Sequence, residues 1–107
     1  MIDPGSDTTI LDPVVLRPFV AIGMDYARIV IVNAPGLGGM GYFSEYAIEL
    51  RIIHPSGKPR RDLVLPDFPV VERPLGAPGY DVLIGRDVLK DCLFTLNGPA
   101  NTFTLGY

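Results

Sequence analysis

Near its start the chain reads Ile2-Asp3-Pro4-Gly5-Ser6-Asp7-Thr8-Thr9-Ile10, and the architecture that we expect follows from these nine residues. Pro4 has a fixed φ and restricts the residue before it to extended conformations. Gly5 then allows the backbone to turn sharply. We therefore expect Asp3 to lie at a tight turn just past a strand, which is how a fold displays a reactive carboxylate.

A second motif lies far downstream, at Val82-Leu83-Ile84-Gly85-Arg86-Asp87-Val88-Leu89. Together the two motifs resemble the retroviral-type (retropepsin-like) aspartic proteases. In that family the first loop reads apolar-Asp-Thr-Gly-Ala/Ser, often followed by Asp and Thr, and a run like the second motif ends a strand and opens the only helix. The resemblance covers roughly residues 2 to 107, and Pro4 stands where the family usually has Thr.

The resemblance implies an all-β fold: a retropepsin-like closed barrel, or acid-protease half-domain, with one short helix near residues 86–91. It implies a single domain over residues 1–107. This domain is N-terminally truncated relative to the family, because the strands that the family has upstream of the loop are missing here. Either the chain is a fragment of a longer protein or the domain is shortened, and in both cases an exposed sheet edge must be covered by a partner chain or rearranged. The C-terminal hairpin, which ends Phe103-Thr104-Leu105-Gly106-Tyr107, is the expected contributor to a subunit sheet.

The resemblance also implies a chemistry. One carboxylate cannot perform aspartic proteolysis, because one group must activate a water while another donates a proton to the scissile carbonyl. Two carboxylates a few ångströms apart titrate as a unit. A chain of 107 residues with one such loop resembles the half-size enzymes, in which Asp3 of two copies would meet at a two-fold axis. The implied partners are a second copy and a peptide or protein substrate, with water as nucleophile and neither metal nor cofactor.

The implied site has a catalytic residue, Asp3, and three supporting groups of residues. These are the rest of the active-site loop (Pro4, Gly5, Ser6, Asp7 and Thr8), a supporting pair (Gly85 and Arg86), and a flap that closes over substrate (Gly36, Leu37, Gly38, Gly39, Met40 and Gly41). By position in the family, Asp7 pairs with Arg86, whose planar guanidinium can engage a carboxylate with two hydrogen bonds. We therefore expect an ion pair that ties the loop to the helix.

Short apolar runs between turn residues predict the strands. Residues 28–32 and 42–53 flank a Gly-rich segment and predict the flap hairpin, and residues 62–65 return as the partner strand of a second hairpin. Further strands are expected at 68–72 and 80–84, followed by a strand, turn and strand over 92–105. Asp12-Pro13 indicates either a short helical turn that ends at Pro18 or a plain connector.

The composition argues against several classes of protein. A single Cys, Cys92, allows no internal disulfide and no Cys-based metal site. The net charge of −3 without a large basic cluster argues against nucleic acid, and no apolar run is long enough to span a membrane. No signal peptide is visible, so a cytoplasmic location is expected. An apolar share of 48% is high for a small monomer and indicates a subunit interface.

Pro4 leaves the function open between two classes. In the family, the Thr hydroxyl at this position bonds across the dimer axis, and Pro has neither that hydroxyl nor a backbone N–H. The leading hypothesis is an aspartic endopeptidase with a dyad shared across a homodimer. The alternative is a catalytically inactive retropepsin-like module for dimerisation or peptide binding, and a more remote one is an unrelated all-β binding domain. An apolar peptide preference is expected from a cleft lined by Leu11, Ile31, Val32, the flap and Ile84, or by their neighbours.

Overall fold

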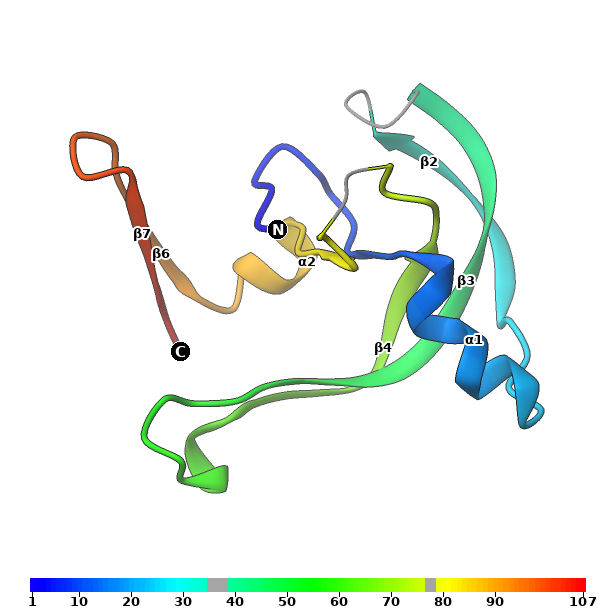
Figure 1. Ribbon diagram of the computed structural model, residues 1–107, viewed down its shortest axis with the longest axis horizontal. Coiled ribbons are helices and arrows are strands. Elements are labelled where there is room, and N and C mark those ends of the chain that lie inside the picture. The colour runs from blue at the N-terminus through cyan, green and yellow to red at the C-terminus, as the bar shows by residue number, and fades with distance from the viewer. Residues whose placement is uncertain (35–38, 77–78) are drawn as a thin grey trace.

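The computed structural model describes residues 1–34, 39–76 and 79–107, with residues 32–34 described by their backbone. Strands outnumber helices throughout these ranges (Figure 1), so the chain is mainly β, as predicted. In chain order the elements are β1 (Ile10–Leu11), α1 (Pro13–Ala21), β2 (Arg28–Ala34), β3 (Gly39–Ile52), a 3-10 turn (Pro59–Arg61), β4 (Leu63–Glu72), β5 (Val82–Leu83), α2 (Arg86–Leu89), β6 (Leu93–Asn97) and β7 (Thr102–Gly106).

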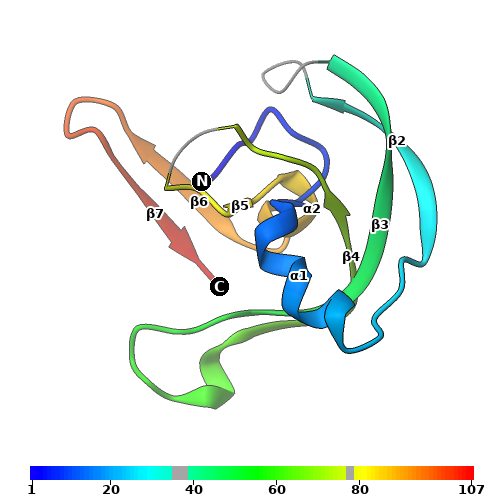
Figure 2. The ribbon, with the colours of Figure 1, turned by 45° about the vertical axis from the view of Figure 1, so that its right-hand side comes forward.

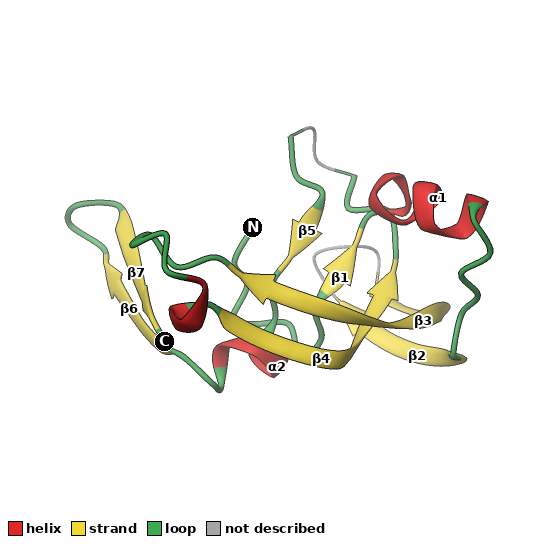
Figure 3. Ribbon diagram, turned by 90° about the horizontal axis from the view of Figure 1, so that it is seen from below, coloured by secondary structure: helices red, strands yellow, loops and turns green. Residues whose placement is uncertain are grey.

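The strands form one five-stranded sheet in the order β2-β3-β4-β1-β5 and a separate β6–β7 hairpin (Figure 3). Strand β1 runs parallel to β4 and antiparallel to β5, so the start of the chain is inserted between two later segments. In the part of the chain that the structure describes, β2 and β5 lie at opposite edges and do not pair. The predicted closed barrel is therefore corrected to an open sheet plus a hairpin.

The two predicted hairpins are present. Strand β2 pairs antiparallel with β3 from Arg28↔Glu45 to Ala34↔Gly39, and β3 pairs antiparallel with β4. The strands expected at 62–65 and 68–72 are in fact one strand, β4. Its pairing with β3 shifts by a residue near Asp67, whose φ is 50°, so a bulge absorbs what the sequence presents as a break.

Helix α1 corrects the expectation of a single short helix. The side chain of Asp12 accepts a hydrogen bond from the Val14 N–H and caps the helix, with Pro13 at its first position. The helix does not end at Pro18 but continues to Ala21. Burial of Leu16, which is 1% exposed, together with the cap offsets the backbone hydrogen bond that Pro18 removes.

The core lies on both faces of β1, because successive side chains of a strand point to opposite faces. Ile10 packs with Val71, Leu75 and Leu83 on one face. Leu11 packs on the other face with a second cluster, formed by Leu16, Tyr46 and Val70. Helix α1 covers this second cluster through Leu16, and Figure 2 shows the helix beside β4. No helix in the described ranges is long and apolar enough to cross a membrane.

Candidate functional site

Residues 3–8, called the Asp3 loop below, begin with the tight turn that the sequence predicts. The loop leaves the β5 side of the sheet, where Ile2 bridges Ile84 and the Asp3 N–H donates to the Ile84 carbonyl at 2.9 Å. The Gly5 N–H then donates to Asp3 Oδ1 at 2.9 Å, and the Ser6 N–H donates to the Asp3 carbonyl at 3.1 Å. Asp3 as a whole residue is half-buried, and the backbone of its own turn fixes the orientation of its carboxylate through an exposed hydrogen bond.

The second half of the loop is locked against the start of α2. Ser6 is buried, and its hydroxyl donates to the Thr8 carbonyl at 2.8 Å. The Ser6 carbonyl accepts a hydrogen bond from the Arg86 N–H at 2.8 Å. A Cβ added at Gly85 would lie 2.5 Å from the Thr8 carbonyl oxygen, so the backbones approach more closely than any side chain allows. Gly85, predicted as a supporting residue, therefore lies at the centre of this junction.

Asp87, which was not predicted as a site residue, makes two short hydrogen bonds at this junction. Thr9 is completely buried, and Asp87 accepts from both its hydroxyl (2.7 Å, to Oδ1) and its N–H (2.9 Å, to Oδ2). The Thr9 hydroxyl oxygen also accepts from the Gly85 N–H at 3.2 Å. One carboxylate thus satisfies two donors of a fully buried residue. The available signal was an acidic residue in the first turn of a helix that directly follows a glycine.

The predicted ion pair between Asp7 and Arg86 is present. Its side chains are 79% and 59% exposed, respectively, so water screens the pair and its contribution to stability is small. The part-buried Thr9–Asp87 hydrogen bonds also tie the loop to the helix, and they are better shielded from water than this ion pair.

The predicted flap falls partly outside the described residues. Gly36, Leu37 and Gly38 belong to the segment that the structure does not describe, whereas Gly39, Met40 and Gly41 begin β3. Met40 is 71% exposed, and Gly39 has a φ of 84°, a value that glycine adopts without strain.

Arg73 secures the turn end of this hairpin and was also missed. Its side chain is 4% exposed, and its guanidinium lies 4.7 Å from the centroid of the Phe43 ring. It also donates to the Gly39 carbonyl at 3.2 Å, while its backbone N–H donates to Leu11. A single arginine therefore connects the β2–β3 hairpin to β1, and nothing in the local sequence pattern around it indicates this role.

The residues expected to line an apolar cleft belong to different elements of the fold. Leu11 packs in the cluster beside α1, and Ile31 is 58% exposed on β2. Ile84 is half-buried beside the Asp3 loop, and the side chain of Val32 lies outside the described residues.

Other reactive groups have ordinary structural roles. Burial raises the pKa of the Cys92 thiol, which keeps it protonated, and its sulfur lies 3.6 Å from the Val88 carbonyl. His54 lies at the β3–β4 turn, bonded to Ser56 and in edge contact with the Tyr107 ring. No group of three or more potential metal ligands occurs in the described part of the chain.

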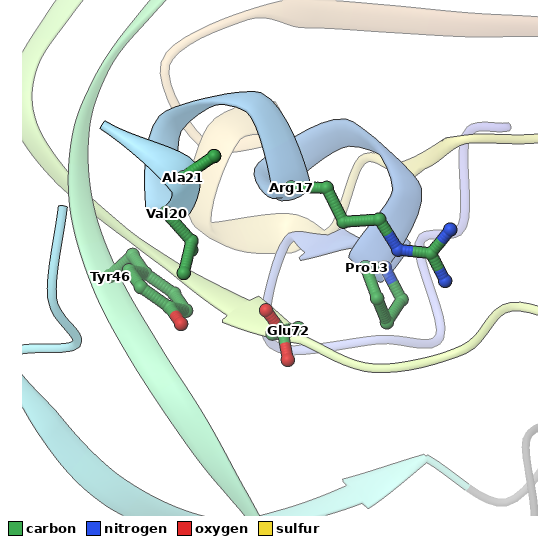
Figure 4. Close-up of a pocket in the computed structure, with 6 residues that line it drawn as sticks. All are labelled: Pro13, Arg17, Val20, Ala21, Tyr46 and Glu72. Atoms are coloured by element: carbon green, nitrogen blue, oxygen red, sulfur yellow. The ribbon is translucent and has the colours of Figure 1, made fainter. Parts of the chain in front are cut away.

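Two cavities flank α1. One, of about 430 Å³, is lined by Pro13, Arg17, Val20, Ala21, Tyr46 and Glu72 (Figure 4). Burial, followed by the nearby Glu72 and Asp25 charges, raises the pKa of Tyr46. The other cavity, of about 510 Å³, lies between α1 and β3. Neither cavity includes a residue of the Asp3 loop.

No protein-family model, curated protein or solved structure matches the chain.

Proposed function

We propose that the chain is an aspartic endopeptidase of retropepsin-like fold, with a catalytic dyad built from Asp3 of two copies. The observation that carries the proposal is the Asp3 carboxylate itself. It lies at a turn and is oriented by the Gly5 N–H, in a loop fixed to the rest of the fold by hydrogen bonds that span the chain. Such fixed positioning is what general acid–base chemistry requires of a reacting group.

The proposed division of labour follows from the dyad. One Asp3 carboxylate takes a proton from the attacking water while the other, protonated, donates to the carbonyl oxygen of the scissile bond. No donor in the described residues other than the Gly5 N–H reaches the Asp3 side chain, so its second oxygen is free to face a water or the partner carboxylate. The β2–β3 hairpin would cover an extended peptide or protein substrate, with neither metal nor cofactor.

The C-terminal hairpin supports a second copy as partner. Phe94, Leu96, Phe103 and Leu105 share one face of β6–β7, because they pair as Phe94↔Leu105 and Leu96↔Phe103. Leu96 is 69% exposed and Phe103 is 51% exposed. A two-stranded hairpin with an apolar face is marginal in water unless that face is covered. We propose that this face contributes to the homodimer interface.

The test is cleavage of a mixed peptide library at about pH 5 and about pH 7, because the activity of a carboxylate dyad depends on pH. Asp3→Asn is run beside the parent, because it keeps the size of the side chain and removes the carboxylate. Cleavage by the parent that disappears in Asp3→Asn is the expected result. Cleavage that persists in Asp3→Asn would contradict the assignment.

Pro4 favours a second candidate, a catalytically inactive module for dimerisation or peptide binding. Pro4 is exposed beside Asp3 and offers no hydroxyl or N–H to a partner loop. Pro4→Thr separates the candidates: cleavage gained by the variant and absent from the parent would assign the natural protein to the inactive class. The cytoplasmic location expected from the sequence belongs to the same proposal.

A further inference from the structure

The C-terminal half of β3, residues 46–52, has an edge that no other strand covers in the part of the chain that the structure describes. Strand β2 covers β3 only as far as the Arg28↔Glu45 pair, whereas β4 follows β3 on its other side to Ile52↔Leu63. Figure 1 shows the two-stranded β3–β4 arm continuing beyond the end of β2. No strand in the described ranges pairs with residues 46–52 of β3 on the side opposite β4.

The backbone groups that point to this edge can be assigned. The Glu45 carbonyl faces the β2 side, because it accepts from the Ala27 N–H at 2.7 Å. Backbone direction alternates along a strand, so Ala47, Glu49 and Arg51 present their N–H and C=O groups to the same side. All three residues are exposed. The bulge at Asp67 adds its extra residue to β4 rather than β3, so the alternation along β3 is not interrupted.

An apolar groove runs beside this edge. The cavity of about 510 Å³ is lined by four consecutive β3 residues, by α1 and by three further residues: Leu11, Val15, Leu16, Phe19, Met24, Ala47, Ile48, Glu49, Leu50 and Val82. The lining includes Ala47 and Glu49, whose backbone groups face the open edge, together with Ile48 and Leu50 between and beside them. Phe19, on its α1 wall, is 52% exposed.

We propose that this edge and groove form a strand-addition site for an extended, apolar segment of a partner polypeptide. The main-chain N–H and C=O groups along this edge favour a polypeptide over other apolar ligands. Only a second extended backbone can form hydrogen bonds with several of these groups at once. Among the described residues that line the groove, Glu49 alone is charged. The groove therefore favours apolar side chains, which an extended segment would present to it at alternate positions. The site does not use Asp3 and does not depend on the proposed protease activity.

The probe is a blocked seven-residue peptide that alternates valine and threonine. On binding it should slow amide hydrogen exchange at Ala47, Glu49 and Arg51 by about tenfold or more, measured by NMR. A counterpart with N-methyl groups on two adjacent central residues cannot pair through either edge and should give no protection. Equal protection by both peptides, or none by either, would overturn the proposal.

Glu49→Pro tests the edge from the side of the protein. The Glu49 N–H points away from β4, so proline removes an open-edge donor and leaves the β3–β4 ladder intact. Affinity for the probe should fall by about tenfold, whereas Glu49→Ala, which keeps the N–H, should bind like the parent. Equal losses in both variants would overturn the backbone pairing. If Glu49→Pro does not fold, the N-methylated probe on the parent decides alone.

Two further measurements separate this site from other occupants. Asp3→Asn should bind the probe as the parent does, and loss of binding there would place the peptide at the Asp3 loop instead. Light scattering without peptide tests a second copy as occupant. A mass that doubles with concentration in the parent but not in Glu49→Pro would assign the edge to self-association and overturn the partner strand.

Discussion

The junction between the Asp3 loop and α2 is closely packed and hydrogen-bonded, whereas the C-terminal β6–β7 hairpin leaves apolar side chains exposed. At the junction, fully buried Thr9 has its N–H and hydroxyl bonded to Asp87. The hairpin instead leaves Leu96 and Phe103 more than half exposed, and Tyr107 connects its end to Ile53 through one hydrogen bond of 2.9 Å. Figure 1 shows the hairpin standing apart from the five-stranded sheet.

The contrast separates what the fold fixes alone from what it offers to a partner. Buried polar groups that are fully satisfied hold a loop in one conformation. An uncovered apolar face gains its stabilisation only when a second surface removes it from water. Substitutions at the junction should therefore change the stability of a single chain, and substitutions on the hairpin face should change association.

The largest expected effect at the junction comes from Gly85→Ala. The added methyl group would lie 2.5 Å from the Thr8 carbonyl oxygen, and two backbones would have to separate. We expect a loss of about 3 kcal/mol or more in the free energy of unfolding, measured by urea denaturation. Gly98→Ala is the matched control, because a Cβ there meets nothing within 4 Å. Equal losses of stability in the two variants would show that the close backbone approach at Gly85 does not contribute to the stability of the chain.

Asp87→Ala should be the next most damaging change. It leaves the N–H and hydroxyl of completely buried Thr9 without their acceptor, at a cost of about 2–3 kcal/mol. Asp91→Ala, an exposed acidic residue on the same segment, should change stability by less than about 0.5 kcal/mol. Similar denaturation midpoints for the two variants would show that the Thr9 contact does not hold the loop.

On the hairpin, the double substitution Leu96→Thr with Phe103→Thr should weaken self-association by about tenfold or more. The two residues are a cross-strand pair on the exposed face, and threonine retains strand propensity. Sedimentation at a series of concentrations measures the change. Thr104→Ser, on the opposite face, should associate like the parent. Unchanged association in the double variant would remove this face from the proposed dimer.

The smallest expected effect is that of Arg86→Ala. Its ion pair with Asp7 is exposed at both ends, so the loss should stay below about 1 kcal/mol and should diminish further at high salt. Exchanging the two charges, with Asp7→Arg and Arg86→Asp together, should restore what either single reversal loses. A loss for Arg86→Ala as large as that for Asp87→Ala would reverse the ranking of the two contacts.

Local signals in the sequence predicted the parts of the fold that depend on neighbouring residues. The turn at Asp3, the Asp12 cap and the hairpins follow from proline, glycine and β-branched patterns, which act over a few residues. The continuation of α1 through Pro18 was not predictable in this way, because burial of Leu16 offsets a local penalty. The closed barrel came from a resemblance rather than from the pattern of strands, and the strand pairing corrected it.

The candidate site divides in the same way. Asp3, Gly85 and the Asp7–Arg86 pair were predicted from the two motifs. The Thr9–Asp87 contact spans 78 positions, and neither residue type at that distance indicates a partner. Arg73 was missed for the same reason, since the Gly39 carbonyl that it bonds lies 34 positions away.

The claim that two copies share one dyad is tested most directly by mixing the parent with Asp3→Asn at a fixed total concentration. If each active site needs Asp3 from both subunits, only parent–parent dimers cleave, and peptide cleavage falls with the square of the parent fraction. An equal mixture should then retain about a quarter of the activity of the undiluted parent. Activity that falls in direct proportion to the parent fraction would contradict a shared dyad, and no cleavage by the parent at any concentration would contradict the protease itself.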